Sequence, residues 1–586
     1  MHFALVVALS ILVTPAAAAR QVPESPRPDA QSDQPVAGYY FLLGRYLEGE
    51  GKVDEAIDAL KRAMALEPRA AEPRAELAAL YARQDRSQDA IAAAEDALKI
   101  DPKNREANRV LGTVLAAMTD RRQPGRPPAQ IAQDRSRAIA ALEIARANSP
   151  SDLSLDLTLA RLYISTDRPS DAVPLLRRIV DEQPSYGDGW LILSSALEAS
   201  GNPDEATDVL NALLHDQPTS IRARVQLAEL YERQRRWPQA AEAWAQVQAL
   251  NQRNTDIVAR RASALLNANR FADARDVLTE ALKTQQGDAR LSYLLAQAQR
   301  ELGDLDAAEA TARGLRERRP EDVRGVYMLA QILEARGRHQ EVVDLLQPEI
   351  ARLRTANGEE GQLALLLDTQ AFAYQQLRRS DAAVAAYKEA VERAPDESIR
   401  HVLLIQGLSA ANRHADALAA AETARRKFPD DTAVLYQFGA ALDRSGRRNE
   451  AARTFRDIIA RDPLDANALN YLGYMFAEQG MELDEAVSLI ERALKVEPDN
   501  ASFLDSLGWA YVQQGKLDLA DRPLSTAAEK LPKNSVIQDH LGDLRFKQDR
   551  RAEAIASWQR ALDGDGESID RAKIQKKIAD ARKDRK

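Results

Sequence analysis

A small residue that returns at a fixed step along this chain constrains its fold more than any other feature. The stretch NYLGYMFAEQGMELDEAVSLIERALKVEP, from Asn470 to Pro498, contains an alanine at position 486 that has counterparts at regular intervals. Eleven of the fourteen intervals are identical, at thirty-four positions, and the three longer ones indicate insertions. These anchor positions are Ala56, Ala90, Ala138, Ala172, Ala206, Ala240, Ala274, Ala308, Val342, Ala383, Ala417, Ala451, Ala486, Ala520 and Ala554. A fixed period of this length is typical of repeat architectures, in which each unit packs on its neighbours.

Each repeat is predicted to form two helices joined by a turn. In EAVSLIERALKVEP, the apolar residues Ala486, Ile490 and Ala493 recur at intervals of four and three, which places them on one face of a helix. The preceding NYLGYMF carries Gly473 between large apolar residues. Eleven of the repeats end in a proline, because its ring clashes with the previous helical turn and it lacks an N–H.

A small residue on the first helix accompanies a large one on the second. Twelve positions before the anchor, allowing for insertions, fourteen repeats carry glycine, alanine or serine, and Ile405 is the exception. Four positions after the anchor lies a larger residue, which we call the filler, such as Trp244, Tyr387, Phe455 or Trp558. We expect the small residue to let the two backbones approach closely while the filler occupies the space beside it.

This pattern resembles the tetratricopeptide repeat over about residues 37–566, in fifteen units. The resemblance implies an all-α, right-handed superhelical solenoid of about fifteen helix–turn–helix repeats, with the first helix of each lining the concave face. We divide the array into repeats 1–9 at 37–353, with a loop insertion at 119–132, and repeats 10–15 at 354–566. The second insertion, around residues 351–361, is expected to separate two rigid blocks.

The N-terminal sequence MHFALVVALSILVTPAAAAR predicts a secretory signal peptide at residues 1–19. Its apolar run is too short for a comfortable membrane span and precedes an alanine-rich cleavage site. Residues 20–36 are rich in proline and polar side chains, which predicts a mobile linker. The chain has no cysteine, so disulfides and a lipid-modified cysteine are excluded. We expect a soluble periplasmic or secreted protein that is not a lipoprotein.

No catalytic or metal-binding motif was found along the chain. There is no phosphate-binding loop, nucleophile elbow or HExxH sequence, and the six histidines are scattered. His401 and His414 share a repeat but lack a third ligand. The net charge of −9 disfavours nucleic acid as a partner. We therefore predict a protein that is not an enzyme and uses no cofactor or metal.

Two sets of residues on the first helices are predicted to face the groove and bind protein or peptide partners. The central set is Tyr293, Gln297, Arg300, Arg324, Tyr327 and Gln331. Its arginines and tyrosines favour a carboxylate or an acidic peptide. The C-terminal set is Tyr436, Asn470, Tyr474, Asp505, Trp509, Asp539 and Asp543. It is acidic and aromatic and favours basic or amide groups. The alternative is that these residues only give the groove a polar, hydrated surface and bind no partner, since any solenoid must present polar groups there.

The C-terminal segment 567–586 is predicted to form a basic capping helix. Residues 571–586 contain eight basic and two acidic residues, and Ser568 can cap the helix. The apolar residues Ala572, Ile574, Ile578 and Ala581 are expected to cover the last repeat while the charges face water. A contact with a membrane or an anion is the alternative.

The repeats between residues 470 and 532 resemble those of proteobacterial envelope tetratricopeptide proteins, through NYLGYMFAEQG and LDSLGWAYVQQGKLDLA. Some of those proteins deliver substrates to a C-terminal processing protease, and others help assemble outer-membrane or polysaccharide machinery. The resemblance implies a non-enzymatic scaffold or adaptor in the bacterial cell envelope. The alternative is a structural subunit of an outer-membrane, polysaccharide-export or pilus assembly machinery. A cytoplasmic assembly factor is a third option if the signal is not cleaved, and the oligomeric state is left open.

Overall fold

The computed structural model describes residues 36–120, 126–147, 152–251, 254–356, 358–565 and 569–583. The predicted signal peptide, the linker up to residue 35, the centre of the first insertion and Ser568 lie outside these ranges. The regular structure of the described residues consists of 31 α-helices, so the all-α prediction is confirmed.

The chain forms two compact units, one up to Gln252 and the other from Arg253. The helices of unit 1 are α1 (Ala37–Gly49), α2 (Val53–Leu66), α3 (Glu72–Arg83), α4 (Ser87–Ile100), α5 (Arg105–Asp120), α6 (Pro128–Ala147), α7 (Leu153–Ser165), α8 (Pro169–Glu182), α9 (Gly187–Ala199), α10 (Pro203–Asp216), α11 (Ile221–Arg233) and α12 (Trp237–Leu250).

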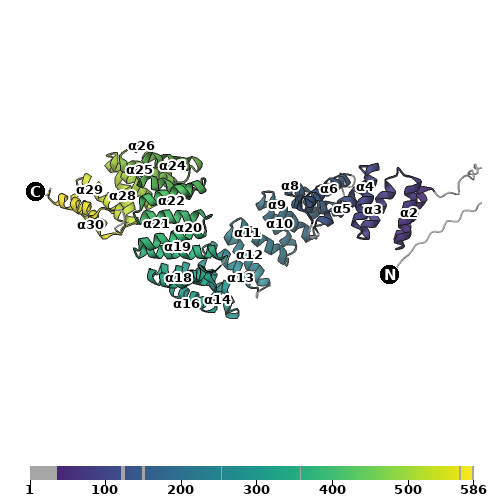
Figure 1. The fold of residues 1–586 in the computed structure, drawn as a ribbon, viewed down its shortest axis with the longest axis horizontal. Helices are drawn as coiled ribbons and strands as arrows, with labels where there is room; N and C mark the ends of the chain where they lie inside the picture. Colours follow the sequence, from purple (N-terminus) through teal and green to yellow (C-terminus); the bar gives the residue numbers. More distant parts are fainter. Residues whose placement is uncertain are drawn as a thin grey trace, which may run out of the picture. The chain divides into compact units, whose positions relative to one another are not determined.

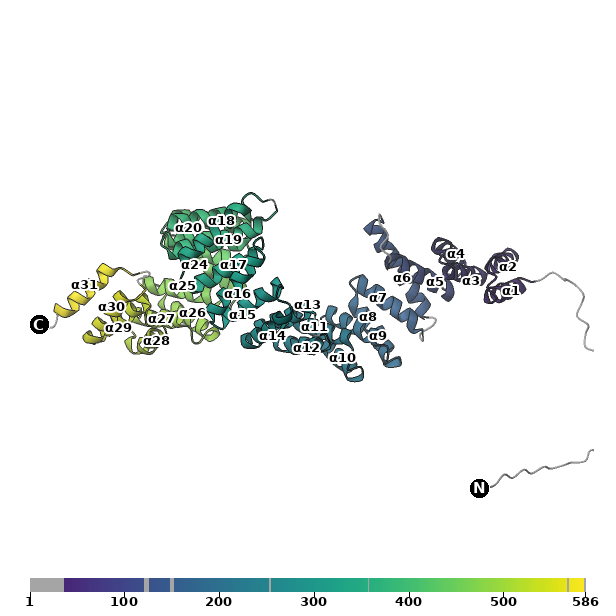
Figure 2. The same cartoon turned by 90° about the horizontal axis from the view of Figure 1, so that it is seen from below.

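Unit 2 carries the remaining nineteen of the described helices. They are α13 (Thr255–Asn267), α14 (Phe271–Thr284), α15 (Ala289–Glu301), α16 (Leu305–Arg318), α17 (Val323–Ala335), α18 (His339–Leu353), α19 (Glu360–Gln376), α20 (Ser380–Arg393), α21 (Ser398–Ala410), α22 (His414–Lys427), α23 (Thr432–Arg444), α24 (Arg448–Arg461), α25 (Ala466–Gln479), α26 (Leu483–Val496), α27 (Ala501–Gln513), α28 (Leu517–Lys530), α29 (Ser535–Lys547), α30 (Arg551–Asp563) and α31 (Arg571–Lys583). Helices α1 to α30 pair into fifteen hairpins, which stack side by side within each unit (Figures 1 and 2).

The first helix of each hairpin is called its A helix and the second its B helix. In unit 2, successive A helices pack against one another at nearly every step from α13 to α29, whereas successive B helices do not approach as closely. The A helices of unit 2 therefore lie on the inner side of its curve. This arrangement puts the side chains that were predicted to bind partners on the inner face.

The repeat anchors are buried throughout the described chain. Each of the fifteen is at most 1% exposed. A side chain added at the small position would collide with the filler: a Cβ on Gly439 would lie 2.8 Å from Cε2 of Phe455, and a Cβ on Gly542 would lie 2.4 Å from Cδ1 of Trp558. The predicted close approach of the two helices of a repeat is confirmed.

The exception at Ile405 has a compensating partner. By the register of the other repeats, Ile405 on α21 faces Ala421 on α22, and both are buried in one cluster. The large residue has thus moved to the A helix and the small one to the B helix. Gly407 provides the close approach to the preceding repeat instead, because a Cβ there would lie 2.6 Å from Cδ2 of Tyr387.

The two predicted insertions have different structural effects. In the first, α5 continues to Asp120 and α6 begins at Pro128, so most of its described residues extend these two helices. Arg126 joins the two helices, because it donates a hydrogen bond of 3.0 Å to the Met118 carbonyl and forms an ion pair with Asp134.

The second insertion was expected to separate two rigid blocks at residue 353/354. This boundary falls inside unit 2, where one buried cluster continues from Ala296 to Ala510.

Asp521 links the last two repeats and should make their stability depend on pH. Its carboxylate accepts hydrogen bonds from Arg545 at 3.0 Å, Gln548 at 3.1 Å and Arg550 at 3.1 Å. The hydrogen bond from Arg545 lowers the pKa of Asp521 to about 2. Because the folded pKa lies below the unfolded value, this contribution to stability is fully present above about pH 3.9 and is lost as the pH falls through about 2.

We expect Asp521→Asn to lower stability at neutral pH by roughly 0.5–1 kcal/mol, since the site is partly solvated. The difference from the wild type should shrink towards zero near pH 2. Denaturant titrations followed by circular dichroism at pH 7, 4 and 2.5 measure it. Asp518→Asn, at an exposed position of the same helix, is the control. A difference between Asp521→Asn and the wild type that stays constant with pH would contradict this assignment.

Candidate functional site

On each A helix, the residue three positions before the small residue and the residue one position after it face inward. We call the series of these residues along unit 2 the inner ladder. From α15 to α29 it consists of Tyr293, Gln297, Tyr327, Gln331, Asp368, Phe372, Val402, Gln406, Tyr436, Ala440, Asn470, Tyr474, Asp505, Trp509, Asp539 and Asp543. Eleven of the thirteen predicted binding residues belong to the ladder, and Arg300 and Arg324 lie beside it on α15 and α17.

The central set of predicted residues comes together at α15 and α17. Arg300 on α15 donates 2.5 Å from Nη1 to Oε1 of Gln331 on α17. Burial raises the pKa of Tyr293, and the neighbouring Tyr327 adds to the shift. Gln297 lies one turn after Tyr293 and is half-buried. The sequence therefore located a real cluster of aromatic, amide and cationic groups.

The two arginines of this cluster already have acidic partners. Nη2 of Arg300 lies 2.5 Å from Oε1 of Glu301, and Nη2 of Arg324 lies 2.7 Å from Oδ2 of Asp322. The hydrogen bond from Arg324 lowers the pKa of Asp322, so this pair is charged at neutral pH. An acidic ligand would have to compete with these carboxylates, which weakens the preference for acidic peptides that the sequence indicated.

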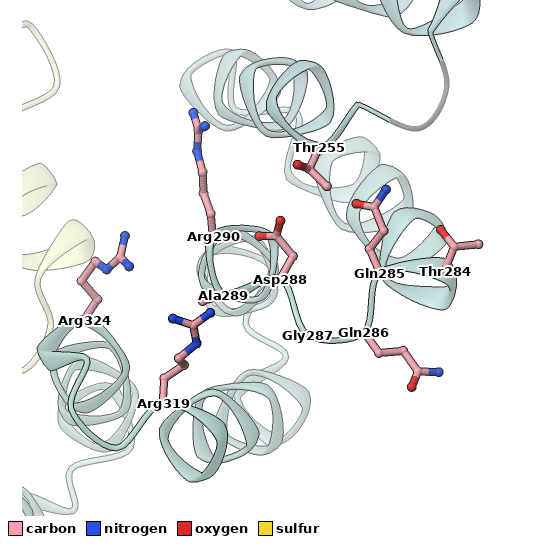
Figure 3. Close-up of a pocket in the computed structure, with 10 residues that line it drawn as sticks. All are labelled: Thr255, Thr284, Gln285, Gln286, Gly287, Asp288, Ala289, Arg290, Arg319 and Arg324. Carbon is pink, nitrogen blue, oxygen red and sulfur yellow. The ribbon is translucent and has the colours of Figure 1, made fainter.

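An open cavity of about 690 Å³ lies next to the central set, at the N-terminal ends of α13, α15 and α17. Figure 3 shows three arginines on its rim, Arg290 from α15, Arg319 from the turn before α17, and Arg324 from α17. Nη1 of Arg290 lies 2.6 Å from Oδ1 of Asp256. Sequence reasoning missed Arg290, although it stands one repeat period before Arg324 and the fixed step could have found it.

Phe372 on α19 is a second omission. Its side chain is 46% exposed, and it occupies the ladder position between Gln331 and Gln406. The insertion between the anchors of this repeat and the preceding one hides the correspondence in the sequence. With Tyr327 and Gln331 it extends the central set by one repeat and supplies an apolar contact.

The C-terminal set is organised around a histidine that the sequence did not single out. Nδ1 of His540 on α29 lies 3.0 Å from both carboxylate oxygens of Asp505 on α27. The imidazole stacks on Trp509, with centroids 4.2 Å apart and planes at 13°. Tyr474 on α25 lies 6.3 Å from the same ring. Three predicted residues, from the two preceding repeats, thus surround one buried imidazole.

The charge of His540 depends on its acidic neighbours. Burial opposes protonation, but the acidic neighbours, with Asp505 foremost, together outweigh it and raise the pKa of His540. Asp539 and Asp543 contribute in the same direction. The imidazole is engaged by Asp505 and Trp509 and is buried, so it does not face a ligand. In the sequence, His540 directly follows the predicted site residue Asp539, and this adjacency could have indicated its role.

The remaining members of the C-terminal set have different surroundings. Tyr436 packs edge-on against Phe455 and Tyr471, at centroid distances of 5.5 and 5.6 Å, so it contributes to packing. Oδ1 of Asn470 and Nε1 of Trp509 are buried and have no hydrogen-bond partner within the described part of the chain.

Asp539 and Asp543 are not free to bind a ligand in this structure. Lys577 of α31 lies between them, with Nζ 2.8 Å from Oδ1 of Asp539 and 2.7 Å from Oδ1 of Asp543. Nε1 of Trp558 also donates 3.0 Å to Oδ1 of Asp543. The capping helix pairs with both carboxylates, so a partner would have to take its place, and their role in partner binding stays a prediction.

The capping helix otherwise covers the last repeat largely as expected. Ile574, Ile578 and Ala581 are at most 6% exposed and cluster with Trp558. Ala572 is exposed, which corrects its predicted role. The expectation that all charges of this helix face water is also wrong, since the Lys577 side chain is only 20% exposed.

The described residues contain no group of three or more metal-ligating side chains. Among these same residues, no helix combines the length and the apolar composition needed to cross a bilayer. What the inner ladder does offer is polar and aromatic groups in register from repeat to repeat, which is an arrangement suited to binding an extended or helical partner.

Known proteins similar to this chain share its repeats. Models described as tetratricopeptide repeat match residues 47–114, 157–221, 197–264, 265–332 and 367–397. The model for the N-terminal tetratricopeptide repeat region of Psidin matches residues 400–527. The tetratricopeptide repeat-containing protein PA4667 of Pseudomonas aeruginosa is 33% identical over 166 residues, which are 28% of this chain and 28% of that protein. The chain thus aligns with little more than a quarter of this relative's length.

Two of the solved structures that match this chain are the following. The complex of Naa15/Naa10 bound to HypK-THB matches with a TM-score of 0.38 and 14% identity, over 93% of this chain and 99% of that chain. A thermophilic tetratricopeptide protein of Thermus thermophilus matches with a TM-score of 0.29 and 24% identity, over 32% of this chain and 98% of that chain. The family models, together with the buried anchors and the fifteen stacked hairpins, lead to one conclusion: the chain is a tetratricopeptide repeat protein.

Proposed function

We propose that the chain is a non-enzymatic scaffold that binds a protein or peptide partner along the inner ladder of unit 2. The observation that carries this proposal is the register of aromatic and polar side chains along the inner ladder, from Tyr293 to Trp509, which includes the exposed Phe372. Tetratricopeptide repeat proteins bind protein partners, and aromatic and arginine side chains supply much of the energy of such interfaces. Phe372 and Trp509 are the aromatic residues best placed to anchor a ligand.

We place this scaffold in the bacterial cell envelope as an adaptor for a protease or an assembly complex. One feature supports the location, the apolar segment followed by an alanine run at residues 1–19. The repeats at 470–532, which resemble those of envelope proteins, support the adaptor role. A structural subunit of an outer-membrane, polysaccharide-export or pilus assembly machinery is the second candidate.

A pull-down with the full chain from an envelope extract, read by mass spectrometry, tests this proposal. We expect Arg300→Ala combined with Arg324→Ala to lower recovery of the partner about tenfold, because two interface arginines together contribute roughly 1–2 kcal/mol. Arg316→Ala, at an exposed position of the B helix α16, is the matched control and should leave recovery unchanged.

The identity of the recovered proteins separates the candidates. A protease together with its substrates supports the adaptor, and secretion or polysaccharide-export subunits support the structural subunit. Recovery that is the same for the wild type, the double variant and Arg316→Ala would remove the central set as the binding site. Failure to recover any envelope protein would overturn the proposed function.

A further inference from the structure

The capping helix α31 occupies the place of a sixteenth A helix. Lys577 follows Asp543 by the same repeat period that separates Asp543 from Trp509, so Lys577 continues the inner ladder in register. Figure 2 shows α31 beyond α30 at the C-terminal end of unit 2. Unlike the fifteen preceding A helices, α31 has no B helix packed on its outer side among the described residues.

Lys577 shows which chemistry the acidic end of the ladder accepts. Its ammonium lies within 3.0 Å of all four carboxylate oxygens of Asp539 and Asp543, and 5.8 Å from the centre of the Trp558 ring. The Lys577, Asp539 and Asp543 side chains are 20%, 21% and 23% exposed, so this cluster is well shielded from water. Hydrogen bonds between charged groups in such surroundings are stronger than those at an open surface.

The attachment of α31 is small compared with that of the repeats. Its buried residues form a separate cluster with the last B helix, through Ile574, Ile578 and Ala581, which is not continuous with the main core of unit 2. Arg571 adds a hydrogen bond of 2.8 Å to the Leu562 carbonyl. A helix held by one ionic cluster and three apolar side chains can leave without unfolding the array.

We propose that α31 is an internal competitor for the acidic end of the inner ladder. The partner that replaces it is an amphipathic helix of another protein, with a lysine in the place of Lys577 and branched apolar residues three positions before it and one position after it. Charge complementarity selects this partner, because the three acidic residues Asp505, Asp539 and Asp543 outnumber their single basic neighbour, His540, once Lys577 leaves. This inference rests on the proposed function and specifies its partner at one end of the ladder.

A labelled peptide with the sequence of residues 571–586, RAKIQKKIADARKDRK, is a defined probe for this site. Fluorescence anisotropy titrations use the full chain as wild type, as Lys577→Glu and as Lys576→Glu. Lys577→Glu repels the cap from Asp539 and Asp543, so it should bind the peptide at least tenfold more tightly than the wild type. Lys576→Glu makes the same charge change at an exposed neighbouring position and should bind like the wild type.

Two further measurements establish that the peptide uses the ladder. A peptide carrying glutamine in place of Lys577 should bind the Lys577→Glu chain at least fivefold more weakly than the native peptide. Adding Asp539→Asn and Asp543→Asn to that chain should abolish the gain. Circular dichroism of each chain before titration verifies that the helical array is intact.

Equal binding by the Lys577→Glu and Lys576→Glu chains would overturn the proposal, and so would equal binding of the two peptides. Tight binding of the peptide by the wild type would do the same, because the cap would then not compete. The assay contains no envelope protein. Its failure therefore leaves the pull-down result for the proposed function standing, and a failed pull-down leaves the peptide result interpretable.

Discussion

Replacing Ala486 with glutamate is expected to destabilise unit 2 by roughly 3–5 kcal/mol, because it places an unpaired carboxylate at a helix crossing that has no room for it. Ala486 is fully buried on α26, and its carbonyl oxygen lies 2.9 Å from where a Cβ on Gly473 would be. Urea denaturation followed by circular dichroism measures the loss.

Ser488→Glu provides the matched control for this prediction, since it adds the same charge at an exposed position of α26. It should change stability by less than about 0.5 kcal/mol. A denaturation curve of Ala486→Glu that superimposes on that of Ser488→Glu would show that the anchor is not a packing position. Because each repeat contacts only its neighbours, the damage should centre on α25 to α27.

The inverted pair Ile405 and Ala421 allows a reciprocal test of packing. Ile405→Ala should leave a cavity that costs about 2–4 kcal/mol, and Ala421→Leu alone should overpack the site by about 1–3 kcal/mol. The double variant restores the large residue on the B helix, which is the arrangement found in most repeats. We expect it to recover most of the lost stability.

Hydrogen exchange of the α21 and α22 amides, together with global denaturation, measures this cycle. Both side chains are at most 1% exposed, so solvent effects on the comparison are small. If the two single costs simply add in the double variant, the residues do not face each other and the register assigned to repeat 11 is wrong.

The helices and the packing inside each repeat were predictable because both depend on residues close in sequence. The small residue, the anchor and the filler lie within seventeen positions of one another, and they predicted that Gly439 meets Phe455 and Gly542 meets Trp558. Ile574 and Ile578 were correctly predicted to cover the last repeat for the same reason.

The binding face was predictable only in part, because its chemistry arises between repeats. Periodicity placed Tyr293, Tyr327 and Trp509 on the inner ladder, and the structure puts them there. It did not indicate that Asp322 and Glu301 neutralise the two arginines, since that depends on side-chain rotamers. The insertion before α19 hid Phe372, because a pattern that relies on a fixed step fails where the step changes.

The repeat pattern alone was enough to predict fifteen helical hairpins, because a small anchor residue at a fixed step allows the two helices of every hairpin to pack closely. Which inward-facing groups a partner can reach became clear only from the contacts between successive repeats. Lys577 contacts Asp539 and Asp543, which lie 38 and 34 positions earlier in the sequence. His540 contacts Asp505, which lies 35 positions earlier. Such contacts depend on how successive repeats stack, and no local pattern of residues encodes them.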